Sequence, residues 1–316
     1  MTEPIGLSTS WNGPGAGPAI LLDQHRALGF RRLEAYAHFT RDELLRLADA
    51  ARVRDMQIAS LHAPCPVPTT ELGQRARYGD WLASTDPAER AAAVDAHRGS
   101  IDAAADVGAR AVVIHLGHTG VPSRQASVFD VVARTGRGSP EHLRLRDEAL
   151  AARRVAAGPH LDAALASMRA LGEHARGTGV VLGVETRDGY QEIPSLDEFS
   201  EVFTTCEGLP VGYWHDAGHG AKLAYGGFIE AHEDYLRRYG HRLVGMHIHD
   251  TQGSRDHRAP GQGDTDFSML ARYLREDTIR TLELHPSVTA SEISQALDLL
   301  ADLPAFGVSE GILVEL

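Results

Sequence analysis

Histidines and a carboxylate stand close together in one short stretch of the chain, residues 245–250. The apolar residues Leu243 and Val244 precede it, and it contains His247 and His249 before ending in Asp250. Packing alone explains such a strand tip poorly, because charged groups are rarely buried without a partner. Imidazole and carboxylate ligands without thiolates suit Mn²⁺, Co²⁺, Fe²⁺ or Zn²⁺. The stretch therefore predicts a strand that ends in a metal or substrate site.

Groups of the same kind end several other predicted strands. In chain order these groups are His62, His115, Glu185, Asp216, His247 with His249, and Glu283. His219 follows Asp216 by three residues, and Asp256 and His257 lie in the loop after the seventh predicted strand. Each has an ordinary explanation by itself, such as a helix cap or a hydrogen-bonded surface group. So many coincidences in one chain are improbable, and we expect these side chains to share one site.

Strands and helices alternate along the whole chain, which predicts a parallel sheet. The predicted strands are residues 5–9, 30–36, 57–62, 109–115, 180–185, 211–216, 243–250 and 279–284. The predicted helices are residues 19–28, 42–54, 87–107, 141–176, 195–206, 228–239, 266–275 and 291–301. Eight such units predict an α/β fold, a single-domain (β/α)₈ TIM barrel over residues 1–316, with catalytic groups at the C-terminal strand ends. An open doubly wound sheet is the alternative, but we find neither a Gly-rich dinucleotide fingerprint after the first strand nor a phosphate loop.

Two long segments without clear periodicity, residues 66–86 and 116–140, interrupt this pattern. Loops of that length in a compact domain are usually functional or mobile, so we expect both to cover the site. The histidines on or beside polar helix positions are expected to be solvated. These are His25, His38, His97, His142, His160, His174, His232 and His241.

Composition narrows the class of protein. The net charge is −12, which argues against a nucleic-acid partner because phosphate-binding proteins usually carry basic patches. No apolar run reaches the length of a membrane span, and the first residues lack a signal-peptide pattern. The two cysteines, Cys65 and Cys206, have neither metal nor redox spacing. We therefore expect a cytoplasmic protein without membrane association.

At these residues the chain resembles the xylose isomerase-like TIM barrel superfamily, which includes sugar and sugar-phosphate isomerases and epimerases, inosose-processing enzymes and endonuclease IV. The pieces that carry the resemblance span almost the whole predicted barrel. They are residues 61–64, 114–115, 184–186, 215–219, 246–250, 256–257 with 260–264, and 282–283. Their order and spacing are typical of the superfamily and do not single out one activity. Because its members are usually dimers or tetramers, the resemblance also implies a homo-oligomer.

The resemblance implies a metal site on Glu185, Asp216, His247 and Glu283. Strand periodicity does not choose between His247 and His249, which share one face, but the family pattern selects His247. Relatives with three metals use the equivalents of His62 and His115 for a second ion. For a third ion they use the equivalents of His219 and a loop Asp-x-His; here the candidates are Asp256 and His257. The chain departs from that last pattern, because Asp256 is adjacent to His257 and Arg255 stands in the first ligand's place.

The leading functional hypothesis is a sugar, sugar-phosphate or keto-polyol isomerase or epimerase that depends on Mn, Co, Mg or Zn. Glu185 and Glu283 would move a proton through a metal-stabilised enediolate while His219 orients oxygens. The residues expected to contact a small carbohydrate are His62, His249, Arg255 and His257. The alternatives are an endonuclease IV-like phosphodiesterase that acts on abasic DNA and a non-catalytic sugar- or metal-binding barrel.

Overall fold

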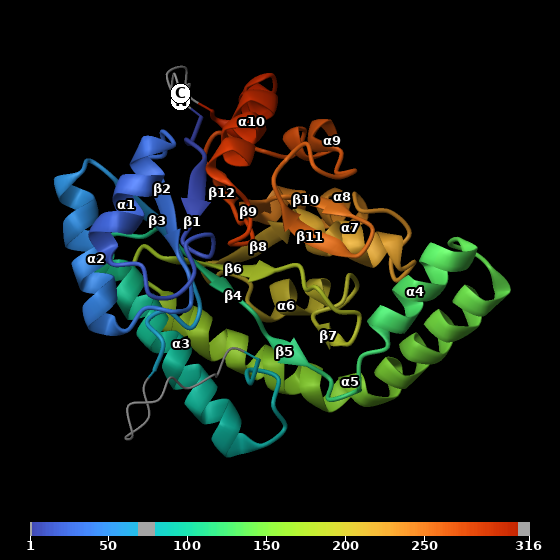
Figure 1. The fold of residues 1–316 in the computed structure, drawn as a ribbon. Helices are drawn as coiled ribbons and strands as arrows, with labels where there is room; N and C mark the ends of the chain where they lie inside the picture. The colour runs from blue at the N-terminus through green and yellow to red at the C-terminus, as the bar shows by residue number, and fades with distance from the viewer. Residues whose placement is uncertain (1, 69–79, 309–316) are drawn as a thin grey trace.

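Parallel strands close into a barrel in the computed structural model, which describes residues 2–68 and 80–308 (Figure 1). Its eight strands follow the order β1-β12-β9-β8-β6-β4-β3-β2 around the barrel. They are β1 (Gly6–Ser8), β2 (Arg32–Ala35), β3 (Gln57–His62), β4 (Ala111–Ile114), β6 (Val181–Glu185), β8 (Val211–Asp216), β9 (Leu243–Ile248) and β12 (Ile279–Leu282). Every neighbouring pair is parallel. The predicted (β/α)₈ TIM barrel is confirmed.

Helices surround the barrel (Figure 1). They are α1 (Pro18–Ala27), α2 (Arg41–Val53), α3 (Pro87–Val107), α4 (Gln125–Thr135), α5 (Pro140–Ala175), α6 (Phe199–Thr205), α7 (Ala217–Tyr225), α8 (Asp234–Tyr239), α9 (Phe267–Ala271) and α10 (Ala290–Ala301), with 3-10 turns η1 (Gly240–Arg242) and η2 (Pro304–Phe306). Capping boxes begin two of them, at Thr40 for α2 and Thr289 for α10. Among residues 2–68 and 80–308, no helix combines the length and apolarity needed to cross a membrane.

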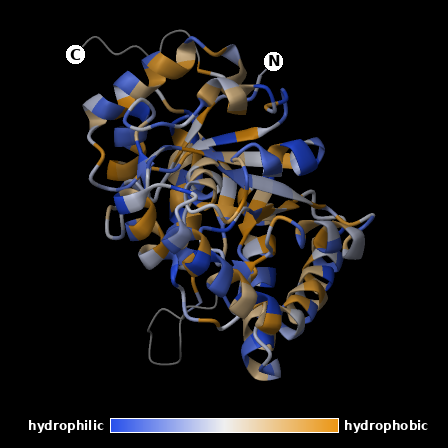
Figure 2. Cartoon of the chain, turned by 90° about the vertical axis from the view of Figure 1, so that its right-hand side faces the viewer, coloured by the Kyte–Doolittle hydropathy of each residue, from blue (hydrophilic) through white to orange (hydrophobic). Residues whose placement is uncertain are grey.

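The hydrophobic core lies between the barrel and the inward sides of the helices (Figure 2). In α5, Leu161, Ala164, Met168 and Leu171 are buried at helical spacing, so one stripe of this long helix faces the sheet. All four residues of β4 are buried, as expected for a parallel strand covered on both faces.

Trp214 of β8 fills the inside of the barrel and is fully buried. Its indole ring lies against Gly183 of β6 and Gly245 of β9, the neighbouring strands. A Cβ at Gly183 would lie 2.8 Å from the ring, and a Cβ at Gly245 would overlap it. The two glycines therefore make room for the tryptophan, which in turn packs against the ring of His247 at 5.1 Å between centroids.

The segment 116–140, which we predicted to be irregular, contains the strand β5 (Gly117–His118) and the helix α4. Val128, Phe129, Val131 and Val132 are buried along one side of α4. The sequence signal for this helix is weak because no side chain caps its N-terminus. Of the other predicted loop, residues 69–79 lie outside the described residues. Its covering role stays a prediction.

Three helix predictions were wrong in their boundaries. The helix predicted at 195–206 begins at Phe199, and only Asp234–Tyr239 of the segment 228–239 is α-helical. The helix predicted at 266–275 ends at Ala271. The helix α7 was not predicted, because Gly218 and Gly220 lower helix propensity. Both glycines are required by packing, since a Cβ at Gly218 would overlap the ring of His249.

The prediction of solvated histidines was wrong for three residues. His25, His97 and His142 are fully buried, and each has a hydrogen-bond partner. His142, for example, donates from Nε2 to the carbonyl of Gly226 at 2.9 Å. His241 is exposed, as predicted.

Candidate metal and substrate site

Three carboxylates converge on one ring nitrogen at the C-terminal end of the barrel. Nδ1 of His247 lies 2.7 Å from Glu185 Oε1 and 3.1 Å from Glu283 Oε2. Asp216 Oδ2 is 3.6 Å from the same nitrogen. One ligand atom from each of the four residues lies within 4.8 Å of the others. We call these four residues the central group.

The strand register places the central group. Asp216 of β8 pairs with His247 of β9, and Glu185 is the last residue of β6 on the other side of β8. Glu283 directly follows β12, the next strand after β9 in the barrel. Since the C-terminal ends of parallel strands meet on one face of the barrel, these separated residues become neighbours.

Burial and charge fit a divalent cation in the central group. The four residues are at most 4% exposed, and burying three carboxylates requires compensating positive charge. Burial would raise the pKa of Glu185, but His115 and His247 outweigh it and hold this pKa well below its usual range. Burial would likewise lower the pKa of His247, but Glu283, Glu34 and Glu185 raise it. Three carboxylates and one imidazole are a donor set suited to Mn²⁺, Co²⁺, Mg²⁺ or Zn²⁺.

Glu34 of β2 is a buried carboxylate that the sequence analysis did not select. Its Oε2 accepts a hydrogen bond from Nε2 of His247 at 3.1 Å, on the ring edge opposite the central group. The hydroxyls of Ser8 and Ser60 donate to the same carboxylate at 3.1 and 2.8 Å. A carboxylate between the apolar residues Leu33 and Ala35 of a predicted strand was the available signal, since a buried carboxylate requires partners.

His249 lies behind Asp216. Its Nε2 donates to Asp216 Oδ1 at 3.0 Å, and its Nδ1 accepts the backbone N–H of His257 at 2.9 Å. The ring is fully buried with both nitrogens engaged. The structure thus places His249 as a support for Asp216, while its contact with substrate stays a prediction.

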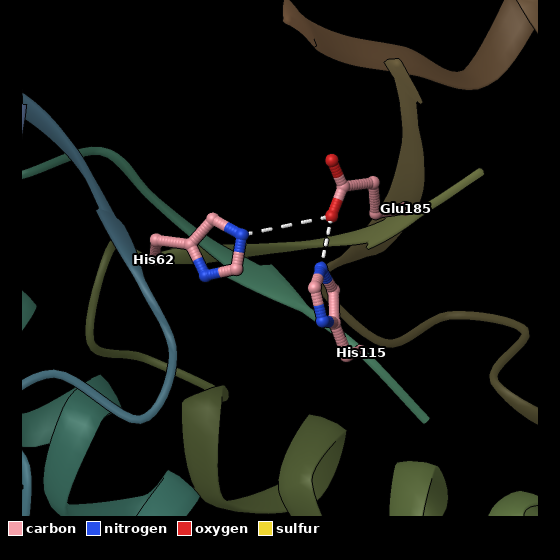
Figure 3. A group of neighbouring side chains, drawn as sticks. All are labelled: His62, His115 and Glu185. Carbon is pink, nitrogen blue, oxygen red and sulfur yellow. Dashed lines mark hydrogen bonds and ion pairs between the residues drawn. The ribbon is translucent and has the colours of Figure 1, made fainter. Parts of the chain in front are cut away.

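A second group of metal-type donors shares Glu185 with the central group. His62 and His115 both point toward Oε2 of this carboxylate (Figure 3). His115 Nε2 is hydrogen-bonded to that oxygen, and His62 Nε2 lies 3.7 Å from it. The guanidinium of Arg187 is also close, with NH1 3.6 Å from Glu185 Oε2. This second group therefore has a fixed positive charge beside it.

The third group consists of His219, Asp256 and His257, whose ligand atoms lie within 4.8 Å of one another. His257 has a left-handed backbone, with φ 53°, in the strand β11 (Arg255–Arg258), which pairs with β10 (Asp250–Gln252). That conformation breaks the strand alternation, so adjacent side chains can reach one group. Asp256 is paired with Lys222 of α7, whose Nζ is 2.8 Å from its Oδ2.

His219 lies in the first turn of α7, where its Nδ1 donates to the carbonyl of Thr186 at 2.9 Å. Burial would lower its pKa, but Asp216, Glu185 and Asp188 outweigh it and raise the pKa to about 9. The imidazole is therefore a hydrogen-bond donor at neutral pH, at the edge of the central group.

Comparison with known proteins decides the family. The model of the xylose isomerase-like TIM barrel family matches residues 22–303. The chain belongs to this family. No curated protein matches the sequence.

Solved structures share the fold of this xylose isomerase-like barrel. A D-tagatose 3-epimerase-like protein superposes with a TM-score of 0.65 at 15% identity, covering 96% of this chain and 98% of its own. The 3-keto-D-glucoside 4-epimerase from E. coli superposes with a TM-score of 0.65 at 17% identity, and the match covers 95% of this chain and 100% of the epimerase. The IolI protein, solved with a bound zinc atom, superposes with a TM-score of 0.64 at 14% identity, and the match covers 96% of this chain and 99% of IolI. At these identities the likeness shows a common fold.

Within this xylose isomerase-like barrel, most of the residues selected from sequence come together at one face. Arg255 is exposed and lines a cavity of about 480 Å³ together with Asp256 and His257. Its contact with substrate stays a prediction. Three buried groups were missed, namely Glu34, Arg187 and Lys222. Arg187 follows Glu185 by only two residues, so its distance from a strand end was the signal that could have found it.

Proposed function

We propose that the protein is a divalent-metal-dependent sugar isomerase or epimerase that moves a proton on a carbon next to a carbonyl group. The observation that carries the proposal is the pair of carboxylates, Glu185 and Glu283, on the same nitrogen of His247 at 2.7 and 3.1 Å. The epimerases among the structural neighbours support it.

The central group would hold the ion, which is Mn, Co, Mg or Zn. Such an ion, when bound, supplies a Lewis acid that polarises a carbonyl. Glu185 is buried in the central group and would accept the proton as general base. Glu283 would return the proton from the other side of the site. His219 would donate a hydrogen bond to a substrate oxygen, and His62 and His257 would contact other hydroxyls.

The proposed partner is a small carbohydrate and not a nucleic acid, in keeping with the net charge of −12. Assembly into a homo-oligomer and a cytoplasmic location stay predictions.

A proton-exchange experiment tests this function. The metal-loaded protein is incubated in deuterated water with D-fructose, D-tagatose and other ketoses, and deuterium uptake is followed by NMR. We expect exchange by the wild type and its loss in Glu185→Gln. Glu201→Gln on the exposed side of α6 is the matched control and should keep full exchange. Exchange that persists in Glu185→Gln would show that another residue is the base.

One observation favours a second candidate, an endonuclease IV-like phosphodiesterase. His62 and His115 converge on Glu185 as ligands of an additional ion would (Figure 3). Two-metal sites stabilise the attacking and leaving oxygens of phosphate esters. Incision of abasic DNA by the purified protein, lost on chelation, would establish this activity instead.

A further inference from the structure

Arg187 is held rigidly against the carboxylate that the central and second groups share. Its side chain is 7% exposed, and Nε and NH2 donate to Glu192 Oε1 at 3.1 and 2.5 Å. NH1 belongs to the other side of the guanidinium and lies 3.6 Å from Glu185 Oε2. Among residues 2–68 and 80–308, NH1 has no hydrogen-bond partner. Glu192 thus fixes a positive charge that presents unused N–H groups beside Glu185.

The two oxygens of Glu185 face different surroundings. Oε1 is directed at His247 and the central group, whereas Oε2 is directed at His115, His62 and Arg187. An ion bound by the two histidines would have to share Oε2 with the guanidinium. Two cations on one buried carboxylate oxygen repel strongly, because the protein interior screens charge poorly. The histidine donors suit a metal, but the charge beside them does not.

Lys222 likewise places a fixed positive charge beside a carboxylate, here in the third group. Its side chain is 10% exposed, and its Nζ is 2.8 Å from Asp256 Oδ2 and is also paired with Asp188. Asp256 is the only carboxylate that the third group has. In the part of the chain that the structure describes, no lysine or arginine forms an ion pair with Asp216 or Glu283. Within the described residues, only the central group therefore keeps two carboxylates, Asp216 and Glu283, that are not paired with a lysine or arginine.

We propose that Arg187 and Lys222 supply the positive charge that a second and a third metal ion would supply in the second and third groups. The protein then binds one divalent ion, in the central group. His62, His115 and NH1 of Arg187 then meet oxygens of the substrate. This inference rests on the proposed function and narrows its substrate class to hydroxy-carbonyl compounds. A phosphodiester would lack the second ion that stabilises its leaving oxygen.

Metal stoichiometry tests the inference without relying on activity. The full-length metal-free protein is dialysed against Zn²⁺, and the retained zinc per chain is measured by elemental mass spectrometry. We expect one zinc in the wild type and in Arg187→Lys, which keeps the charge. We expect Arg187→Gln to retain a second zinc, because the neighbouring positive charge has been removed. Its affinity for this second ion should be at least about tenfold higher than any affinity of the wild type for a second ion. Adding His115→Ala to Arg187→Gln should return the count to one.

Arg153→Gln is the matched control for removal of a buried arginine. Arg153 is 9% exposed, makes a two-point ion pair with Glu198 and donates to the carbonyl of Glu192 at 2.8 Å. Its removal therefore disturbs the surroundings of Arg187 without removing the charge of Arg187. Its substitution should leave the zinc count at one. Thermal unfolding of each variant shows whether it is folded before its metal content is compared.

Two or more zinc ions retained by the wild type would overturn the inference, as would a folded Arg187→Gln protein that still retains one. If Arg187→Gln does not fold, the variants His62→Ala and His115→Ala test the inference instead. Both should retain one zinc, like the wild type. A wild type that retains several zinc ions and loses one in either variant would overturn the proposal. Failure of the proposed function is a separate result, namely no proton exchange with any ketose by a wild type that retains one zinc.

Discussion

His247 and Glu34 are joined by a fully buried hydrogen bond, with Nε2 of the imidazole 3.1 Å from the carboxylate. The other ring nitrogen faces Glu185 and Glu283. Because a carboxylate holds one edge of the ring, the opposite nitrogen is fixed toward the central group. Glu34 is fixed in turn by Ser60, whose hydroxyl donates to it at 2.8 Å. The orientation of the proposed ligand His247 is thus determined by a carboxylate on β2, a strand that carries no residue of the central group.

Glu34→Gln should weaken metal binding by about 10- to 100-fold, as loss of a carboxylate behind a metal-bound histidine usually does. The amide keeps the size of the side chain but removes the charge that orients and polarises His247. Competition with a chelator of known affinity measures the effect. Ser60→Ala should produce a smaller change in the same direction, because Glu34 keeps its contacts with Ser8 and His247. Equal metal affinity in Glu34→Gln and the wild type would contradict this role.

The sequence was sufficient for the residues whose position follows from strand order alone. Glu185, Asp216, His247 and Glu283 lie at or near the ends of four consecutive predicted strands, so a barrel necessarily gathers them. Glu34 was missed because it lies within a predicted strand and not at its end. Arg187 and Lys222 were missed because the role of each cation depends on which carboxylate it contacts. These contacts join side chains from separate elements and cannot be predicted from strand order.

Fold prediction failed where packing overrides local preference. The helix α7 contains two glycines that weaken it as an isolated helix, yet a side chain at Gly218 would overlap His249. The helix α4 lacks a side-chain cap and is stabilised by burial of Val128 and Phe129. In both cases the tertiary contacts that favour the helix come from distant parts of the chain.

Gly245→Ala should destabilise the barrel by about 3 kcal/mol, at the upper end of the cost of overpacking a core. The added methyl group would overlap the ring of Trp214, which is fully buried and has no space to move away. Urea unfolding measures the change. Gly99→Ala on α3 is the control: nothing lies within 4 Å of the new methyl group, and the helix should gain up to about 1 kcal/mol. Trp214→Phe should partly restore stability to Gly245→Ala, and a failure to do so would contradict the steric explanation.

Asp250→Ala should loosen the loop that follows the β10–β11 hairpin. Its two carboxylate oxygens accept the backbone N–H groups of Thr251, Gly261, Gly263 and Thr265 at 2.8–3.0 Å. Four N–H groups would lose a charged partner, at a cost on the order of 3 kcal/mol. Hydrogen exchange of the two glycine amides should accelerate.

Asp264→Ala is the matched control for Asp250→Ala, because Asp264 is exposed on the same loop. If the protein has the proposed activity, Asp250→Ala should raise KM more than it lowers kcat, since the hairpin carries His257 but neither proton-transfer carboxylate. Unchanged exchange rates in Asp250→Ala would show that other contacts hold the loop.

The stability of the protein should fall as the pH is lowered below about 6.5, because buried histidines resist protonation. Burial lowers the pKa of His25 to about 3 and that of His97 to about 4. The unfolded chain therefore binds protons on these residues between the folded and unfolded pKa values, while the folded chain does not. Each buried histidine contributes stability above pH 6.5 and loses about 1.4 kcal/mol of it per pH unit below that value. Urea unfolding between pH 7 and pH 5 should show a shallower decline in His25→Gln than in the wild type. His241→Gln, at an exposed position, should follow the wild-type curve, and parallel curves for all three proteins would mean that His25 is not held neutral in the folded state.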